Sequence, residues 1–332
     1  MMKFFTKFYR LLIISGIIFF IILSWVLSFF VSKINPMIYG VSFSPEYAGY
    51  LKLDPQKVFD TILNEWKFKY IRLSAQWNKL EKKQGEFDFS ELDWQMDGAT
   101  KSGAHVVMAL GQKTPRWPEC HLPEWVNNLS DEDYRLALEN YMAKVVGRYK
   151  NNPALEIWQV ENEPFLAFGK NCPKFNIGLL SEEIALVKAL DSFHPTLVSD
   201  SGELSTWRKT ANVADLFGTT MYRVVWSKYI GYWSYRFLPP IFYRLKLFLN
   251  SRPIEQAFVM ELQGEPWIPD KDIFDVPLEE QYKSMSLERL KKNVTYAAKV
   301  GMPRGYLWGA EWWFWLKERG VKAKTSKGEL KE

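Results

Sequence analysis

Two glutamates in this chain each follow a short apolar run, and such carboxylates could do acid/base chemistry. The run at 154–160 leads to Glu163, and the run at 256–260 leads to Glu261 much later in the chain. A carboxylate at the carboxyl end of a buried strand must face a cleft or find a partner, because an unpaired charge in an apolar interior costs several kcal/mol. Two such strand ends suggest paired carboxylates at one mouth of a barrel.

Short runs rich in β-branched and aromatic residues predict the strands that would position these glutamates. The runs are residues 37–43, 69–74, 104–110, 155–161, 195–200, 216–222, 256–262 and 304–310. Amphipathic stretches typical of helices separate them, and this alternation implies parallel strands joined by crossovers. Eight repeats in about 270 residues predict an α/β fold of the (β/α)8 barrel type. An open, doubly wound sheet is the alternative, and the even spacing favours the barrel.

Two segments depart from this repeat. The stretch at 224–250 is aromatic and basic, and it is longer than a barrel loop and helix require. We interpret it as the sixth barrel helix with a packed lead-in, and a membrane-facing flap is the alternative. The tail at 317–332 is highly charged, which predicts disorder.

Composition limits the classes of function. The chain has 332 residues and is 47% hydrophobic, enough for one sizeable core, so we assign residues 32–316 to a single catalytic domain. It contains 15 Trp, and an aromatic excess often lines clefts that bind the flat faces of sugar rings. The net charge of +5 is spread among acidic residues, so we expect no nucleic acid partner.

The segment 11–31 is almost uninterruptedly apolar and carries no charge. At 1.5 Å per residue it is long enough to cross a hydrocarbon core of roughly 30 Å. Basic residues in the tail at 1–10 predict a cytoplasmic N-terminus, with the catalytic domain on the other side of the bilayer. A cleaved signal peptide is the alternative, but the run is long and VSKINP, which follows it, lacks a small-x-small cleavage site. The sequence therefore predicts a single-pass membrane anchor.

The chain has two cysteines, Cys120 and Cys172, both in loop-like stretches. A disulfide between them would suit an extracytoplasmic domain, and two unrelated thiols are the alternative that the sequence leaves open. The chain has only 3 His residues, which form no ligand cluster with the cysteines, so we expect no structural metal site.

Active sites of (β/α)8 barrels lie at the carboxyl ends of the strands. Strand four leads into Asn162-Glu163-Pro164, and strand seven ends near Glu261. These two strands face each other across an eight-stranded barrel. In a retaining glycosidase, one carboxyl group protonates the leaving oxygen while a second attacks the anomeric carbon from about 5 Å away. The predicted positions of Glu163 and Glu261 are compatible with this chemistry.

The Asn162-Glu163-Pro164 triplet resembles the strand-four signature of a large clan of retaining (β/α)8 glycoside hydrolases. Members carry an acid/base Glu after strand four and a nucleophile Glu after strand seven. The resemblance implies that Glu163 is the acid/base, that Glu261 is the nucleophile, and that Asn162 donates to the sugar 2-hydroxyl. It extends over most of residues 38–315, with the triplet as its most specific part. Glu265, in the less similar ELQGEPW, competes with Glu261.

Three more positions fit the same pattern. The resemblance implies that Arg72, at the end of strand two, keeps the nucleophile ionised, and that the Tyr222 hydroxyl contacts it. It also implies that Trp308 floors the sugar subsite. The alternatives are an interior ion pair for Arg72, an ordinary strand residue for Tyr222 and core packing for Trp308.

Aromatic and polar residues just after strand ends are further candidates for sugar contacts, because loops there assemble the cleft. We assign Trp77, Trp117 and Glu265 to substrate binding and consider Gln112, Glu203 and Trp312 as additional candidates. Core packing or loop structure is the alternative for each.

The resemblance implies an enzyme that hydrolyses O-glycosidic bonds of a poly- or oligosaccharide with retention, through a covalent glycosyl-enzyme. It implies no cofactor, and the expected partners are a carbohydrate and, through residues 11–31, a lipid bilayer. Two alternatives share the same residues. One is a catalytically inactive barrel that binds glycan at the cell surface, and the other is a transglycosylase in surface polysaccharide assembly.

Overall fold

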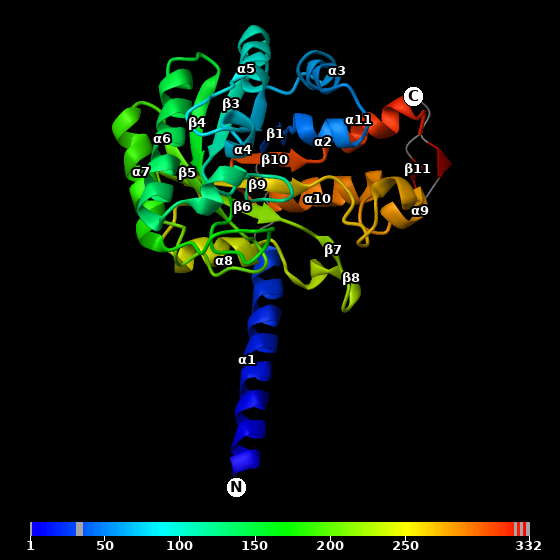
Figure 1. Cartoon of the computed structure of the whole chain (residues 1–332). Coiled ribbons are helices and arrows are strands. Elements are labelled where there is room, and N and C mark those ends of the chain that lie inside the picture. The colour runs from blue at the N-terminus through cyan, green and yellow to red at the C-terminus, as the bar shows by residue number, and fades with distance from the viewer. Residues whose placement is uncertain (1, 31–35, 322–323, 326–327, 330–332) are drawn as a thin grey trace.

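The computed structural model describes residues 2–30, 36–321, 324–325 and 328–329. Within these residues, eight parallel strands close into a barrel in the order β1-β10-β9-β6-β5-β4-β3-β2 (Figure 1). The strands are β1 Ile38–Ser42, β2 Tyr70–Ser74, β3 His105–Leu110, β4 Leu155–Val160, β5 Thr196–Asp200, β6 Leu216–Met221, β9 Ala257–Gln263 and β10 Arg304–Trp308. The predicted runs contain all of these strands to within one residue. Because β1 pairs with both β2 and β10, the predicted barrel is confirmed over the open sheet.

Helices α5, α6, α7, α8 and α10 lie around the barrel, and α1 projects away from it (Figure 1). The α-helices are α1 Met2–Phe30, α2 Pro45–Tyr50, α3 Pro55–Asp60, α4 Trp77–Leu80, α5 Ser90–Ser102, α6 Asp131–Tyr149, α7 Ile177–Leu190, α8 Ile241–Leu249, α9 Leu278–Gln281, α10 Leu287–Val300 and α11 Ala310–Glu318. A π-helical turn at Thr61–Glu65 extends α3, and short 3-10 turns lie at Glu124–Asn128, Tyr235–Phe237, Ile254–Gln256 and Ile273–Asp275. Local sequence sets several helix ends. Ser130 accepts a hydrogen bond from the Asp133 amide, and Gly103 ends α5 at φ 63°.

The barrel strands separate two apolar regions. The larger core packs the outer faces of the strands against the helices, and a smaller cluster comes from strand residues such as Val107 and Ile157. Arg72 pairs in register with Val107, and Gln159 lies two residues after Ile157, so both polar residues share the face of the smaller cluster. This alternation places the Arg72 and Gln159 side chains inside the barrel.

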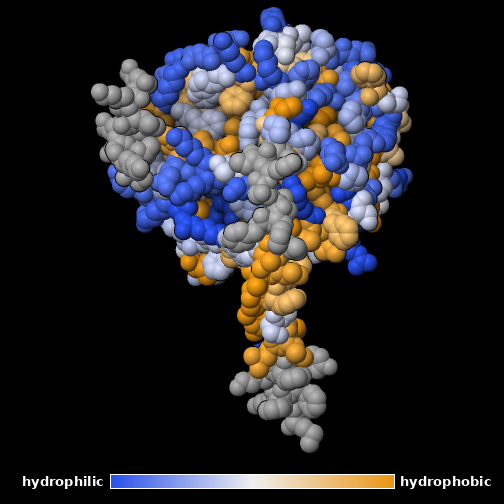
Figure 2. All heavy atoms as spheres, turned by 180° about the vertical axis from the view of Figure 1, so that it is seen from behind, coloured by the Kyte–Doolittle hydropathy of each residue, from blue (hydrophilic) through white to orange (hydrophobic). Residues whose placement is uncertain are grey.

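The predicted membrane anchor at 11–31 falls on α1, except for Val31, which lies outside the described residues. Figure 2 shows α1 as an apolar stalk that projects from the barrel. A membrane span needs about 20 consecutive apolar residues. In the described part of the chain, no helix is both long and apolar enough to cross a bilayer. The predicted transmembrane helix is therefore not supported.

The segment 224–250 follows β6 and contains α8, which is the sixth barrel helix that we predicted there. The lead-in is a β-hairpin formed by β7 Val224–Ser227 and β8 Gly231–Ser234, an element that the sequence analysis did not predict. In the charged tail, β11 Lys324–Thr325 pairs with β12 Gly328–Glu329. The tail residues 322–323, 326–327 and 330–332 lie outside the described part of the chain.

Candidate active site

The barrel brings Glu163 and Glu261 together at the carboxyl ends of opposite strands. Glu163 lies three residues after β4, and Glu261 lies near the end of β9. Thr220, on the intervening strand β6, pairs in register with Glu261 and donates its hydroxyl to Glu163 Oε1 at 3.1 Å. Both glutamates are buried, with exposed fractions of 6% and 4%. The two carboxyl groups therefore face the same small space.

Glu261 is surrounded by hydrogen-bond donors. Arg72 Nη1 donates to its Oε1 at 2.9 Å, and the Tyr222 hydroxyl donates to its Oε2 at 2.8 Å. Each oxygen thus has a partner, which orients the carboxylate and stabilises its negative charge. Arg72 and Tyr222 therefore contact Glu261, as the family resemblance implies.

The Arg72 side chain also organises the end of β4. Its Nε donates to Gln159 Oε1 at 2.8 Å, and its Nη2 donates to Asn162 Oδ1 at 2.7 Å. Since Ser199 also donates to Asn162 Oδ1, at 2.9 Å, the orientation of the Asn162 amide is determined and its Nδ2 is directed away from Arg72. One buried guanidinium therefore connects the two glutamate-bearing strands.

Glu163 has different surroundings. Its backbone adopts φ 46°, in the left-handed region that most residues other than glycine avoid. The Lys113 ammonium group stabilises this backbone conformation by donating to the carbonyl oxygens of Glu163 and Leu166, both at 3.1 Å. Burial, followed by the negative charges of Glu261 and Glu119, raises the pKa of Glu163 well above its usual value. These surroundings therefore favour the protonated form of the Glu163 carboxyl group.

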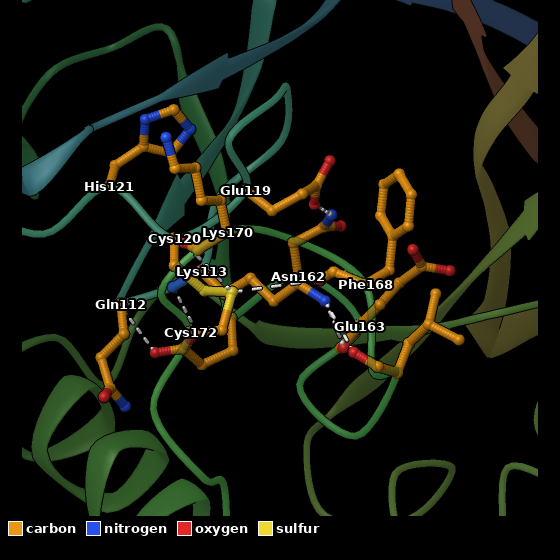
Figure 3. The surroundings of a disulfide bond; sticks show 12 residues. Gln112, Lys113, Glu119, Cys120, His121, Asn162, Glu163, Phe168, Lys170 and Cys172 are labelled. Carbon is orange, nitrogen blue, oxygen red and sulfur yellow. Dashed lines mark hydrogen bonds between the residues drawn. A yellow bond between two sulfur atoms is a disulfide. The ribbon is translucent and has the colours of Figure 1, made fainter. Parts of the chain in front are cut away.

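Glu119 is a third carboxyl group at the site, and the sequence analysis missed it. Its Oε2 accepts a hydrogen bond from Asn162 Nδ2 at 3.1 Å, which Figure 3 shows beside the disulfide. Burial and the charge of Glu261 raise the pKa of Glu119 to about 7. The sequence feature that could have identified Glu119 is its position beside Cys120, in the loop after strand three at the predicted active-site end of the barrel.

Cys120 and Cys172 form a disulfide, with Cα atoms 5.2 Å apart. The bridge that the sequence left open is therefore present. It joins the loop after β3 to the loop after β4, and the Lys170 amide strengthens this link by donating to the Pro118 carbonyl at 3.0 Å. Glu119 lies directly beside the bridge (Figure 3), so the disulfide restrains the loop that carries it.

Glu265 belongs to a separate ion cluster around Arg116. Arg116 forms ion pairs with Glu265 and with Glu311, the latter at 2.9 Å, and burial raises the pKa of Glu311. Its guanidinium lies over the rings of Tyr47 and Trp308, with centroid distances of 3.9 and 4.1 Å. Arg72 and Tyr222 therefore bind Glu261, whereas Glu265 binds Arg116. Arg116 also covers one face of Trp308.

The predicted sugar-binding role of Trp77 is wrong, because its side chain is fully buried. Its Nε1 donates to Glu81 Oε2 at 2.7 Å, and its ring stacks on Tyr141. A tryptophan closed off in this way packs in the core. Gln112 and Trp312, two of the additional candidates, are also buried and hydrogen-bonded to Glu183 and Gln281, respectively.

Trp117 lies where a sugar could contact it. It is 61% exposed and begins a row of aromatic rings that continues through Phe168 and Trp267 to Tyr222, with centroid distances of 5.8, 6.1 and 5.3 Å. Glu203, another additional candidate, accepts hydrogen bonds from the Tyr222 amide and the Tyr243 hydroxyl, and so holds the Tyr222 end of this row in place. Among the described residues, no group of three or more His, Cys, Asp or Glu is arranged to hold a metal ion.

Comparisons with known proteins agree with this architecture. The family model Glyco_hydro_42, described as beta-galactosidase, matches residues 59–176. The solved structure of xylanase 10B from Thermotoga maritima matches with a TM-score of 0.53 and 14% identity, covering 84% of each chain. A GH5_18 structure from Streptomyces cattleya, in complex with GlcNAc, matches with a TM-score of 0.55 and 13% identity, covering 82% of this chain and 70% of that one. At these identities, the structural likeness shows the fold alone.

These findings fit the clan of (β/α)8 glycoside hydrolases. Curated glycoside hydrolases are similar over shorter segments. Endo-1,4-beta-xylanase 3 of Hypocrea jecorina is 30% identical over 115 residues, which cover 34% of this chain and 31% of the xylanase. Beta-galactosidase Pbg of Clostridium perfringens is 29% identical over 154 residues, which cover 40% of this chain and 22% of that protein. The chain thus spans less than a third of the length of these relatives.

Proposed function

We propose that this protein is a retaining glycoside hydrolase in which Glu261 is the nucleophile and Glu163 is the acid/base. The observation that carries the proposal is the contrast between the two carboxyl groups. Glu261 accepts hydrogen bonds from Arg72 and Tyr222, whereas burial and neighbouring carboxylates favour the protonated form of Glu163. Opposite environments of this kind separate a nucleophile from a general acid.

In the first step, a carboxylate oxygen of Glu261 attacks the anomeric carbon of the bound sugar. The bond between that carbon and the leaving-group oxygen breaks, and the proton of Glu163 is transferred to that oxygen. The products are a glycosyl ester on Glu261, the released alcohol and ionised Glu163.

In the second step, Glu163 acts as a base. Its carboxylate takes a proton from a water molecule while the water oxygen attacks the anomeric carbon and displaces Glu261. The sugar leaves with its original anomeric configuration, and both glutamates return to their starting states. The aromatic row from Trp117 to Tyr222 supplies flat apolar surfaces beside this centre for sugar rings.

The names of the relatives suggest where to look for a substrate. Because they are a xylanase and beta-galactosidases, we would first test aryl β-xylobiosides and aryl β-galactosides. Turnover of either by the wild-type protein supports hydrolysis. Binding without turnover across a broad panel of aryl glycosides would instead favour a catalytically inactive glycan-binding barrel.

The nucleophile is tested by Glu261→Ala on the best aryl glycoside. Loss of a nucleophile should lower kcat by about 10⁴-fold or more, and added azide should restore turnover and give a glycosyl azide of inverted configuration. Glu265→Ala is the matched control, because this neighbouring carboxylate pairs with Arg116. Azide rescue of Glu265→Ala, with Glu261→Ala still active without azide, would contradict the assignment.

The acid/base is tested by Glu163→Gln on two substrates that differ in their leaving group. A dinitrophenolate needs no proton to leave, so formation of the glycosyl-enzyme should remain fast and turnover should stop at the second step. An alkyl glycoside should not be cleaved at all. Equal loss on both substrates would contradict general acid catalysis by Glu163.

A further inference from the structure

A cavity of about 930 Å³ lies on the flank of the barrel, between the β7–β8 hairpin, α8, α10 and the C-terminal part of α1. Its lining includes Trp25 from α1, Ser234 from β8, Ile241 from α8 and Thr295 from α10. Neither Glu163 nor any of the residues that contact Glu261 lines it. This space is therefore separate from the candidate active site.

The charged side chains around this cavity are mostly basic. They are Arg223, Arg236, Arg289, Lys291, Lys292 and Lys299, together with the acidic Glu288. Lys292 pairs with Glu288 at 2.6 Å. In the part of the chain that the structure describes, Arg236, Arg289, Lys291 and Lys299 have no ion pair. Burial and the nearby charge of Arg236 lower the pKa of Arg289, and the charge of Glu288 opposes this change in part.

Arg223 adds a buried positive charge to this basic wall. Its Nη2 donates to the carbonyl oxygens of Tyr235 and Leu238, at 2.6 and 3.2 Å, and its guanidinium stacks on the Tyr296 ring at 3.9 Å. These contacts hold the side chain in place, and it is only 8% exposed. Its Nη1 is buried and has no hydrogen-bond partner among the described residues. Because Nη1 is closed off from the cavity, Arg223 contributes a fixed positive charge to the cavity wall, and not an accessible N–H.

We propose that this cavity binds a ligand through its phosphate group. Guanidinium groups match the geometry of phosphate oxygens, and two of them, Arg236 and Arg289, line one cavity with the unpaired lysines and the charge of Arg223. The volume is in the range of sites that hold whole small molecules, so the phosphate would be part of a larger ester. Leu238, Pro239, Pro240 and Ile241 provide an apolar wall for the remainder of that ester.

A phosphate ester could come from two sources, the headgroup of a phospholipid or a soluble sugar or polyol phosphate. The two are distinguished by titrating the full chain, in a non-ionic detergent, with dihexanoyl phosphatidylglycerol and separately with glycerol 1-phosphate, by calorimetry. We expect saturable binding of at least one probe. Binding of the lipid alone identifies a headgroup site, whereas similar binding of both identifies a site for phosphate esters in general.

The test variant is Arg236→Gln/Arg289→Gln, which removes two cations that have no ion pair in the described part of the chain. The matched control, Lys101→Gln/Arg208→Gln, removes the same charge from exposed positions outside the cavity. We expect the dissociation constant to rise about 10-fold or more in the cavity variant and to stay unchanged in the control. A second variant, Lys291→Gln/Lys299→Gln, should show the same direction of change, and thermal unfolding checks that all variants are folded.

Three results would overturn the proposal. They are the absence of saturable binding to both probes, unchanged affinity in both folded cavity variants, and an equal loss in the cavity and control variants. The last result would mean that binding depends on net charge alone.

Discussion

Glu163 and Glu261 are the same residue type at opposite sides of one small space, yet Glu261 lies beside a positive charge and Glu163 lies beside negative charges. Glu261 receives a guanidinium N–H and a phenol O–H, one on each oxygen. Glu163 receives one hydroxyl, from Thr220, and lies in the field of two other carboxyl groups. Neighbouring groups, and not residue type, therefore separate a nucleophile from a general acid.

Among substitutions of the residues around the two glutamates, the largest effect is expected from Arg72→Lys, which acts on the Glu261 side. Lysine keeps the positive charge but cannot reproduce the fork that binds Gln159, Asn162 and Glu261 together. We expect kcat/KM for an aryl glycoside to fall about 10²- to 10³-fold, as for removal of one preorganised electrostatic contact. Arg208→Lys, at an exposed position, is the control. Activity within a few-fold of wild type would show that the fork is not needed.

Tyr222→Phe removes only the hydroxyl that donates to Glu261 Oε2. A hydrogen bond to a charged group contributes about 1.5–3 kcal/mol, so we expect kcat/KM to fall about 10- to 100-fold. The Phe ring preserves the contact with Trp267, so substrate affinity should change less than turnover. Tyr235→Phe is the matched control. A larger effect on KM than on kcat would assign Tyr222 to sugar binding instead.

Glu119→Gln acts on the Glu163 side and should change the pH profile more than the maximal rate. The pKa of Glu119 is about 7, so its negative charge develops above that pH and then raises the pKa of Glu163. Glutamine keeps an oxygen that can accept from Asn162 Nδ2 but carries no charge. The alkaline limb of kcat/KM should therefore move to lower pH. A limb that stays in place or moves to higher pH would refute this coupling.

The smallest effect on turnover is expected from Cys120→Ser/Cys172→Ser, which leaves the charges of both glutamates unchanged. The bridge closes a loop with a sequence separation of 52 residues, and the chain-entropy account gives a loss of about 4 kcal/mol in the free energy of unfolding. Urea unfolding of the full chain in detergent measures this loss. Reduction of the wild-type protein should reproduce it, and a large change in kcat would show that the bridge also positions Glu119.

Much of this protein can be predicted from local sequence pattern. The eight strands follow from short β-branched and aromatic runs, because each buried parallel strand is apolar along its length. Closure of the barrel then brings the ends of β4 and β9 to the same mouth, so the approach of Glu163 to Glu261, and the contacts of Arg72 and Tyr222 with Glu261, follow from strand order.

Other features depend on tertiary contacts that no local pattern encodes. Trp77 and Trp117 both follow strand ends, but one is enclosed by Tyr141 and Glu81 and the other is exposed. The position of Glu119 depends on a loop held by a disulfide to a distant segment. Loop conformation is decided by such long-range contacts, because the loop's own residues do not restrict its backbone to one path. The sequence alone therefore determined the barrel and its two glutamates, whereas the tertiary structure decided what surrounds them.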